Sequence, residues 1–259
     1  MSKIEFKDKK GNIEGKLEIK NQTENSADLH FYGDIISESP GEWYKNYYPD
    51  DKCPSDIKEF LDQLENVNAI NIYLNSGGGS VFGGLAIYNQ LKRYNATINT
   101  YIDGLAGSIA SVIAMAGDNI YMPKNALFMI HKPLTWAGGN ADDFKKIIEL
   151  LDTCQKSILN VYMTKAKVNI TEDVINNLMN EETWFTGEEA AKYFDIVLED
   201  NINIENSIND DYIDKYNIPK NKLENAKQVV SNTAYFNAKK ELPIMDESTR
   251  IMIERINKL

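Results

Sequence analysis

The chain has 259 residues and a formal net charge of −11, and 42% of its residues are hydrophobic. That content is enough for a substantial core, which excludes a disordered chain. The acidic balance argues against nucleic acid as the main partner, because binding phosphates needs clustered Lys and Arg. The only two cysteines, Cys53 and Cys154, have a spacing that indicates neither a disulfide framework nor a metal site.

The apolar stretches predict a soluble, cytoplasmic protein with no membrane segment. The start, MSKIEFKDKKGN, is charged and lacks the apolar run of a signal peptide. The longest apolar-rich segment, residues 104–117, is too short and too rich in Gly, Ala and Ser to span a bilayer.

In chain order, the first half of the sequence alternates between strand and helix signals. Residues 1–26 predict an N-terminal hairpin, and the aromatic, turn-rich segment 37–54 predicts a loop. Strands are predicted at 27–35, 69–75, 97–104, 119–122 and 127–133, and helices at 55–66, 81–95 and 107–117. Such alternation is typical of βαβ units, so we expect an α/β fold with a largely parallel sheet.

The second half begins with one long helical pattern at 141–167, followed by a shorter helix at 171–181. Thr186 then suits the N-cap of a helix formed by GEEAAKYF. From residue 203 the sequence becomes rich in Asn, Asp and Ile and shows no clean helical or strand periodicity. We therefore predict a main domain at 27–202 and a partly ordered C-terminal appendage at 203–259.

Histidine is scarce in this chain, since only His30 and His131 occur. His30 lies within a predicted strand beside aromatic residues, which favours a structural role. His131 lies at the end of a strand, shortly before Pro133, where functional groups commonly project. A structural role for His131 remains the alternative.

Ser108 lies where a predicted strand meets the first turn of the next helix. A serine there is commonly an N-cap. The same position suits a nucleophile, because a helix N-terminus stabilises nearby negative charge.

The glycines of NSGGGS (75–80) follow another predicted strand. Flanking secondary structure disfavours a linker, and no Lys-Ser or Lys-Thr follows as in a phosphate-binding loop. A glycine loop at this point can aim backbone N–H groups at an oxyanion.

The runs NSGGGSVFGGLAIYNQL (75–91) and DGLAGSIASVIAMAGDNIYMPKNALFMIHKP (103–133) resemble the proteolytic subunit family of Clp proteases. The chain looks most like the related proteases of phages and prophages that mature viral heads, and the similarity covers 32–197. The resemblance implies a ClpP/crotonase-like fold of stacked βαβ units. A handle, consisting of a strand plus a long helix, would protrude at about 132–167. No cofactor and no metal are implied.

The resemblance also implies roles for individual residues. Ser108 matches the nucleophile and His131 the general base, while the backbone N–H groups of Gly79 and Ile109 match the oxyanion donors. The third member of the triad maps onto Glu182, with Glu181 and Asp195 as alternatives. Gly77 is a departure, because the family commonly has proline there.

The implied substrate-binding residues are Leu134, Thr135 and Trp136, in the handle strand where extended peptides add by β-pairing. The implied assembly is a homo-oligomeric ring, stacked into a closed chamber through the handle helix. Peptides and proteins are the expected substrates, and a Clp ATPase is a possible partner.

The leading hypothesis is a serine endopeptidase that processes phage or prophage capsid or scaffold proteins. The segments 37–54 and 203–259 and the variant Trp184-Phe185-Thr186 favour this role over its alternative, a housekeeping ATP-dependent Clp proteolytic subunit. Two further alternatives are a crotonase-type acyl-CoA enzyme and a non-catalytic assembly protein that keeps the fold.

Overall fold

The computed structural model describes residues 3–7, 13–18, 26–39, 41–64, 67–199 and 218–219. The strands are β1 (Lys3–Lys7), β2 (Ile13–Glu18), β3 (Ser26–Phe31), β4 (Ala69–Ser76), β5 (Thr97–Gly107), β6 (Asn119–Pro123), β7 (Leu127–Ile130), β8 (Thr183–Thr186) and β9 (Val197–Glu199). The helices are α1 (Glu42–Tyr47), α2 (Pro54–Asp62), α3 (Val81–Arg93), α4 (Ile109–Ala114), α5 (Ala141–Met163), α6 (Glu172–Asn180) and α7 (Gly187–Tyr193). The predicted α/β class with βαβ units is confirmed.

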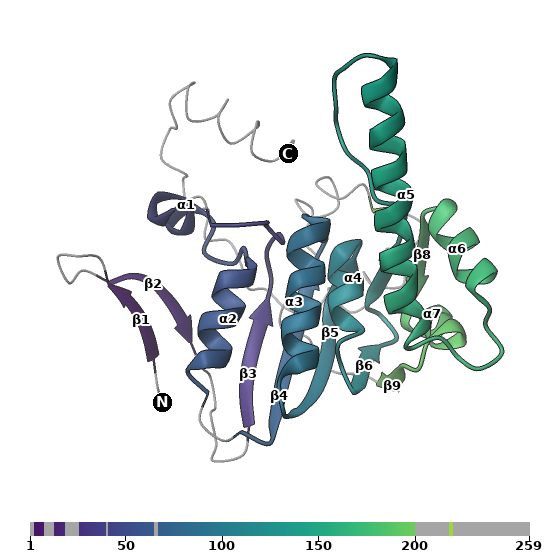
Figure 1. Cartoon of the computed structure of the whole chain (residues 1–259). Coiled ribbons are helices and arrows are strands. Elements are labelled where there is room, and N and C mark those ends of the chain that lie inside the picture. The colour runs from purple at the N-terminus through teal and green to yellow at the C-terminus, as the bar shows by residue number, and fades with distance from the viewer. Residues whose placement is uncertain are drawn as a thin grey trace.

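The main sheet has seven strands and branches at its longest one, β5 (Figure 1). Strands β3, β4, β5, β6 and β9 lie side by side in that order, and all four pairings are parallel. The first half of β5 pairs with β6, whereas its last three residues pair with β7, also in parallel. Strand β8 then adds antiparallel to β7. The branch gives β5 two neighbours on one side, one near each of its ends.

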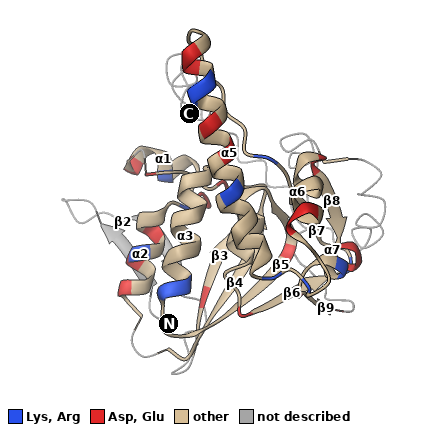
Figure 2. Ribbon diagram, turned by 45° about the vertical axis from the view of Figure 1, so that its right-hand side comes forward, with Lys and Arg blue, Asp and Glu red and all other residues tan. Residues whose placement is uncertain are grey.

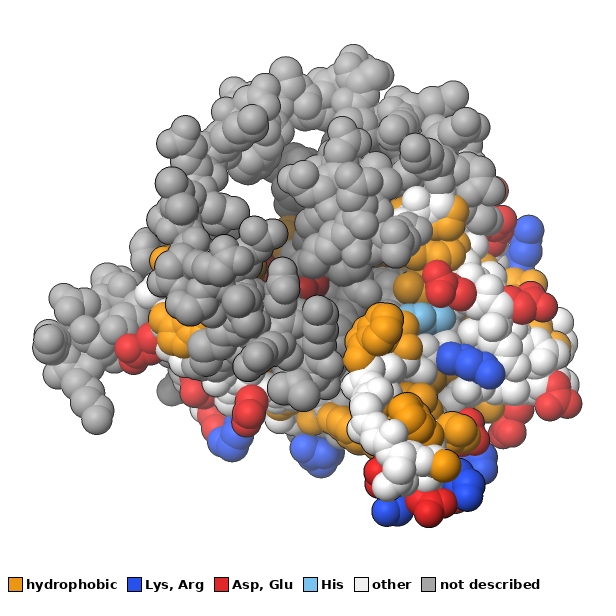
Figure 3. Space-filling view, turned by 90° about the horizontal axis from the view of Figure 1, so that it is seen from above, with side chains coloured by type: hydrophobic (Ala, Val, Ile, Leu, Met, Phe, Trp, Pro, Cys, Tyr) orange, Lys and Arg blue, Asp and Glu red, His pale blue; other side chains and the backbone are white. Residues whose placement is uncertain are grey.

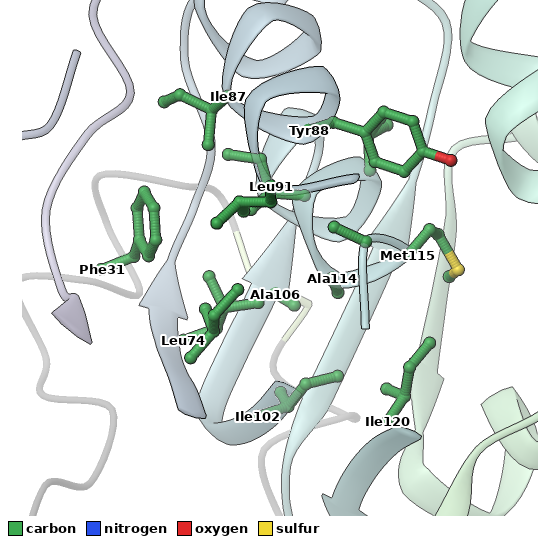
Figure 4. Close-up of a cluster of buried hydrophobic side chains, with 14 of the residues drawn as sticks. Phe31, Leu74, Ile87, Tyr88, Leu91, Ile102, Ala106, Ala114, Met115 and Ile120 are labelled. Carbon is green, nitrogen blue, oxygen red and sulfur yellow. The ribbon is translucent and has the colours of Figure 1, made fainter. Parts of the chain in front are cut away.

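Helices α2, α3 and α4 cover one face of this sheet (Figure 1). Successive strand residues point to opposite faces, and on β4 the alternating apolar residues Ile70, Ile72 and Leu74 are fully buried. Leu91 of α3 and Ala114 of α4 lie over the sheet in the same cluster (Figure 4). The core therefore lies between the parallel strands and these helices.

The opposite face of the sheet carries two ladders of side chains in register. Amide groups link Asp28, Asn71, Asn99 and Asn119 on β3 to β6, with hydrogen bonds of 2.9, 3.1 and 2.9 Å. One step further along the strands, the rings of His30, Tyr73, Tyr101 and Tyr121 stack, with centroids 4.7–5.1 Å apart. His30 thus belongs to the sheet, in line with the structural role expected for it.

Helix α5 projects beyond the rest of the fold as a handle, and charged residues of both signs lie along it (Figures 1 and 2). It begins at Ala141, where Asn140 caps the N-terminus and accepts from the N–H groups of Asp142 and Asp143. The segment 131–140 that precedes it pairs with no strand among the residues that the structure describes. A β-strand needs a hydrogen-bonded neighbour. The predicted handle strand is therefore not formed as a strand among the described residues.

The structure differs from the sequence predictions in two further places. The segment 37–54 contains the short helix α1 instead of being entirely a loop. Strands β8 and β9 were not predicted, and both depend on distant partners, β7 and β6. The predicted appendage 203–259 lies outside the described residues, except for residues 218–219.

Two predicted details have direct counterparts in the structure. Thr186 is the N-cap of α7, as predicted, and its hydroxyl accepts from the N–H of Glu189. The segment 1–26 contains β1 and β2, which pair antiparallel. Among the described helices, none is long and apolar enough to cross a membrane.

Candidate active site

The candidate site forms where parallel strands β4, β5 and β7 end next to one another. Carboxyl ends of parallel strands meet at one edge of a sheet, which brings residues far apart in sequence together. Ser108 follows β5 directly and His131 follows β7 directly, and Gly107 is paired with Met129 between them. The N–H of Ser108 donates to the carbonyl oxygen of Met129 at 2.9 Å, which ties the two strand ends together.

Ser108 and His131 are in direct contact, because Ser108 Oγ lies 2.7 Å from His131 Nε2. Ser108 has φ 52° and ψ −126°, a backbone conformation that residues with a side chain rarely adopt. Such strain occurs at functional turns, where the surrounding structure holds it in place. Ser108 is formally the N-cap of α4, but its side chain makes no capping hydrogen bond and instead faces the imidazole.

His131 is largely buried, with 18% of its side chain exposed. Burial lowers the pKa of His131, and the nearby negative charge of Glu182 opposes this shift. The imidazole is therefore neutral at neutral pH, which is the form that accepts a proton from serine.

Glu182 lies opposite His131 because β7 and β8 are antiparallel and Ile130 pairs with Thr183. Its Oε2 is 4.0 Å from His131 Nδ1, an electrostatic contact slightly beyond hydrogen-bond reach. Glu182 has φ 49°, the left-handed conformation usual for the residue that ends a helix, here α6. The two alternative third members of the triad are Glu181 and Asp195. Glu181 is the C-cap of α6, and the N–H of Asp195 donates to the carbonyl of Lys165. The carboxylate that acts on His131 is that of Glu182.

The glycine loop after β4 packs directly against the Ser108 turn. A Cβ added to Gly78 would lie 2.8 Å from both Gly107 O and Ser108 Cβ, and Gly78 has φ 104°. Gly79 has φ 141°, and a Cβ there would lie 2.2 Å from Ile35 O. Only glycine fits at these two positions. The sequence pattern alone does not single out Gly78, because its closeness to Ser108 depends on the pairing of β4 with β5.

The predicted oxyanion donors are the backbone N–H groups of Gly79, in the glycine loop, and of Ile109, directly after Ser108. Ile109 is the first residue of α4, where N–H groups have no partner within the helix. Gly79 is bracketed by two bonds to Ile35, one from Ile35 N–H to Gly78 O and one from Ser80 N–H to Ile35 O. Neither bond uses the Gly79 N–H. Gly79 and Ile109 remain predicted donors.

A small apolar pocket opens beside Ser108 and His131, with a volume of about 10 Å³, which is room for roughly one water molecule. Its other lining residues are Val81, Ile109, Val112, Pro133, Ile158 and Tyr162. Of the predicted substrate-binding residues, Leu134 and Trp136 are exposed by 66% and 78%, next to the pocket residue Pro133 in sequence. Figure 3 shows hydrophobic side chains on this side of the molecule, seen from above.

Within the described part of the chain, no three His, Cys, Asp or Glu residues lie close enough to hold a metal ion. The groups present are a serine, a neutral histidine, a nearby carboxylate and backbone N–H donors. These are the groups required for nucleophilic acyl transfer on a parallel α/β sheet.

Comparison with known proteins assigns the chain to a family, since residues 56–200 match the family described as Clp protease. The ATP-dependent Clp protease proteolytic subunit of Ligilactobacillus salivarius is 33% identical over 136 residues, 52% of this chain and 68% of the relative. That of Streptococcus mutans is 32% identical over 151 residues, 55% and 74% of the two chains. A Bacteroides fragilis relative is 29% identical over 137 residues, 52% and 65%. The chain belongs to the Clp protease family, which implies a peptidase.

Proposed function

We propose that this protein is a serine endopeptidase in which Ser108 is the nucleophile and His131 the general base. The observation that carries the proposal is the 2.7 Å contact between Ser108 Oγ and His131 Nε2, at the junction of β5 and α4. The neutral state of the buried His131 supports the same assignment. Glu182 is the third member, because its carboxylate is the charge that acts on His131.

The reaction follows from these positions. His131 Nε2 takes the hydroxyl proton as Ser108 Oγ bonds to the peptide carbonyl carbon, and the N–H groups of Gly79 and Ile109 stabilise the oxyanion. His131 then gives the proton to the leaving amine as the C–N bond breaks. A water molecule, deprotonated by His131, hydrolyses the acyl-enzyme and restores Ser108. Glu182 keeps the imidazole oriented and favours its charged form during both steps.

Substrate binding is proposed along Leu134, Thr135 and Trp136, whose exposed side chains lead from the pocket to the handle. In the described part of the chain, no strand pairs with the segment 131–140. An extended peptide can therefore hydrogen-bond to its backbone as an added strand. The apolar pocket lining beside Ser108 favours a small apolar side chain before the cleaved bond.

Assembly into a homo-oligomeric ring is part of the proposal, and the handle supports it. Phe144, Ile148 and Leu150 of α5 are exposed by 46%, 58% and 50%. Large apolar side chains in such number on one helix commonly mark a contact surface. A native mass measurement tests the proposal, and a monomer as the active species would contradict it.

The natural substrate and partner are a finer question. The relatives are named as ATP-dependent proteolytic subunits, which supports the role of a Clp subunit working with an ATPase. Segments 1–55 and 201–259 lie outside the family match and support the more specialised role in capsid or scaffold processing. Degradation of an unfolded protein only with a Clp ATPase and ATP favours the first role. Cleavage of a capsid protein without ATP favours the second.

The decisive experiment is labelling with a fluorophosphonate probe, which reacts with activated serines. We expect labelling of the wild type and none of Ser108→Ala. Ser157→Ala serves as the control, because Ser157 lies on α5 with its hydroxyl bonded to the carbonyl of Thr153. An assembled protein that shows no Ser108-dependent labelling or peptidase activity would refute the proposed function.

A further inference from the structure

A buried tyrosine of the handle helix reaches the turn that carries Ser108. Tyr162 lies on α5, is 1% exposed and lines the pocket beside Ser108 and His131. Its hydroxyl oxygen is 2.7 Å from the hydroxyl oxygen of Ser111 in α4, and Ser111 is itself fully buried. The chemistry proposed above uses neither hydroxyl, so two buried polar groups next to the nucleophile have no assigned role.

The direction of these hydrogen bonds follows from counting protons. Ser111 Oγ donates to the carbonyl oxygen of Ser108 at 2.5 Å. A serine hydroxyl has a single proton, so Ser111 Oγ must accept in its contact with Tyr162, and Tyr162 is the donor. Burial raises the pKa of Tyr162, so its hydroxyl keeps this proton. Two consecutive hydrogen bonds thus run from Tyr162 through Ser111 to the Ser108 carbonyl, and each strengthens the next.

The carbonyl of Ser108 and the N–H of Ile109 belong to one peptide unit. This unit is planar and trans, so its C=O and N–H point in opposite directions. A group that holds the Ser108 carbonyl therefore also fixes the direction of the Ile109 N–H. The Ser108 carbonyl accepts twice from Ser111, from its hydroxyl and from its backbone N–H at 3.0 Å.

The strained backbone of Ser108 explains why such an anchor is needed. The ψ angle of Ser108, −126°, is the rotation that sets the plane of the Ser108–Ile109 peptide unit. Since the φ and ψ values of Ser108 are sparsely populated, local preference does not hold this plane, and neighbouring contacts must. Even a small rotation of this peptide plane turns the N–H away from the oxyanion. The stabilisation that the N–H gives depends on its alignment with that oxygen.

We propose that Ser111 and Tyr162 are positioning residues of the active site: their relay of hydrogen bonds holds the Ser108–Ile109 peptide plane and thereby aims the Ile109 N–H at the substrate oxyanion. This inference rests on the proposed function, in which Ile109 is an oxyanion donor. Tyr162 lies on the handle helix α5, whereas Ser111 lies on α4. The hydrogen bond between them therefore also connects the handle helix to the turn that carries Ser108.

The test compares Tyr162→Phe, Ser111→Ala and the double variant in peptide hydrolysis. Tyr162→Phe removes the hydroxyl and keeps the ring that lines the pocket. We expect kcat to fall about tenfold in Ser111→Ala and about threefold in Tyr162→Phe, with KM unchanged, because losing an oxyanion donor outright costs about 100- to 1000-fold. The double variant should be no slower than Ser111→Ala, since the two residues act in series.

Three further measurements separate positioning from a general loss of structure. Affinity for a peptide boronic acid, which mimics the tetrahedral state, should fall by the same factor as kcat. The acid limb of the pH profile should not move, because His131 is untouched. Tyr88→Phe is the matched control, a buried tyrosine of α3 outside the pocket, and it should retain wild-type kcat.

The outcomes distinguish the two levels of the proposal. If the wild type hydrolyses peptides through Ser108 but both single variants keep kcat within twofold, the positioning role is wrong and the protease remains. Losses that multiply in the double variant, or that appear in KM alone, would also overturn the relay. If the wild type has no Ser108-dependent activity, the proposed function itself fails.

Discussion

Replacing Ser108 with glycine should give a more stable protein than replacing it with alanine, and both variants should be inactive. Both changes remove Oγ and its contact with His131. Alanine keeps a Cβ that is strained at φ 52°, whereas glycine adopts this region freely. The comparison therefore isolates the strain stored in the turn.

The magnitude can be worked from the conformation. A residue held in a sparsely populated region costs about 1–3 kcal/mol. Glycine relieves this strain, but about 0.5–1 kcal/mol of the relief is offset because a glycine gives the unfolded state more conformational freedom. The net advantage of Ser108→Gly over Ser108→Ala is about 0.5–2 kcal/mol, which corresponds to roughly 1–8 °C in Tm for a chain of this size.

Thermal and denaturant unfolding of the two variants measure this difference, and Ser157 provides a control of opposite sign. Ser157 lies within α5, where glycine is about 1 kcal/mol less favourable than alanine. Ser157→Gly should thus be less stable than Ser157→Ala. If Ser108→Gly is no more stable than Ser108→Ala, the Ser108 turn stores no strain and the reasoning is wrong.

Three other changes probe the remaining parts of the site. Glu182→Gln should reduce kcat by at least tenfold. It should also move the acid limb of kcat/KM to lower pH, because the carboxylate raises the pKa of His131. An acid limb that does not move would contradict the pairing of Glu182 with His131. Gly78→Ala should abolish probe labelling, since its Cβ would lie 2.8 Å from Ser108 Cβ, whereas Gly138→Ala, with nothing within 4 Å, should label normally. Thr135→Pro should raise KM severalfold by removing a backbone donor, and an equal effect of Thr135→Ala would refute β-pairing there.

Local sequence patterns predicted much of the fold and singled out Ser108 and His131 as candidate site residues. The strand and helix runs before Ser108 and His131 are short and clearly bounded, so their alternation indicated parallel strands, and each residue could be placed at the end of a strand. The N-cap at Thr186 could also be predicted from the sequence, because capping depends on residues within one helical turn.

Features that depend on distant partners were not predictable in this way. Strand β8 has only four residues and exists because β7 lies beside it, and this pairing is what sets Glu182 opposite His131. Ser111 and Tyr162 are 51 positions apart, and each fits its own helix without reference to the other. Their contact arises only when α5 packs against α4.

The burial of Ile218 has a practical consequence for any shortened form of this protein. Ile218 is 3% exposed and packs with Leu105, Leu127, Met129 and Trp184, side chains of the strands that carry or flank Ser108 and His131. Ending the chain at Glu199 would remove this isoleucine, a loss of about 1.5–3 kcal/mol of hydrophobic stabilisation. A minimal catalytic fragment should therefore continue through Pro219, and an affinity tag or fusion partner belongs beyond that residue.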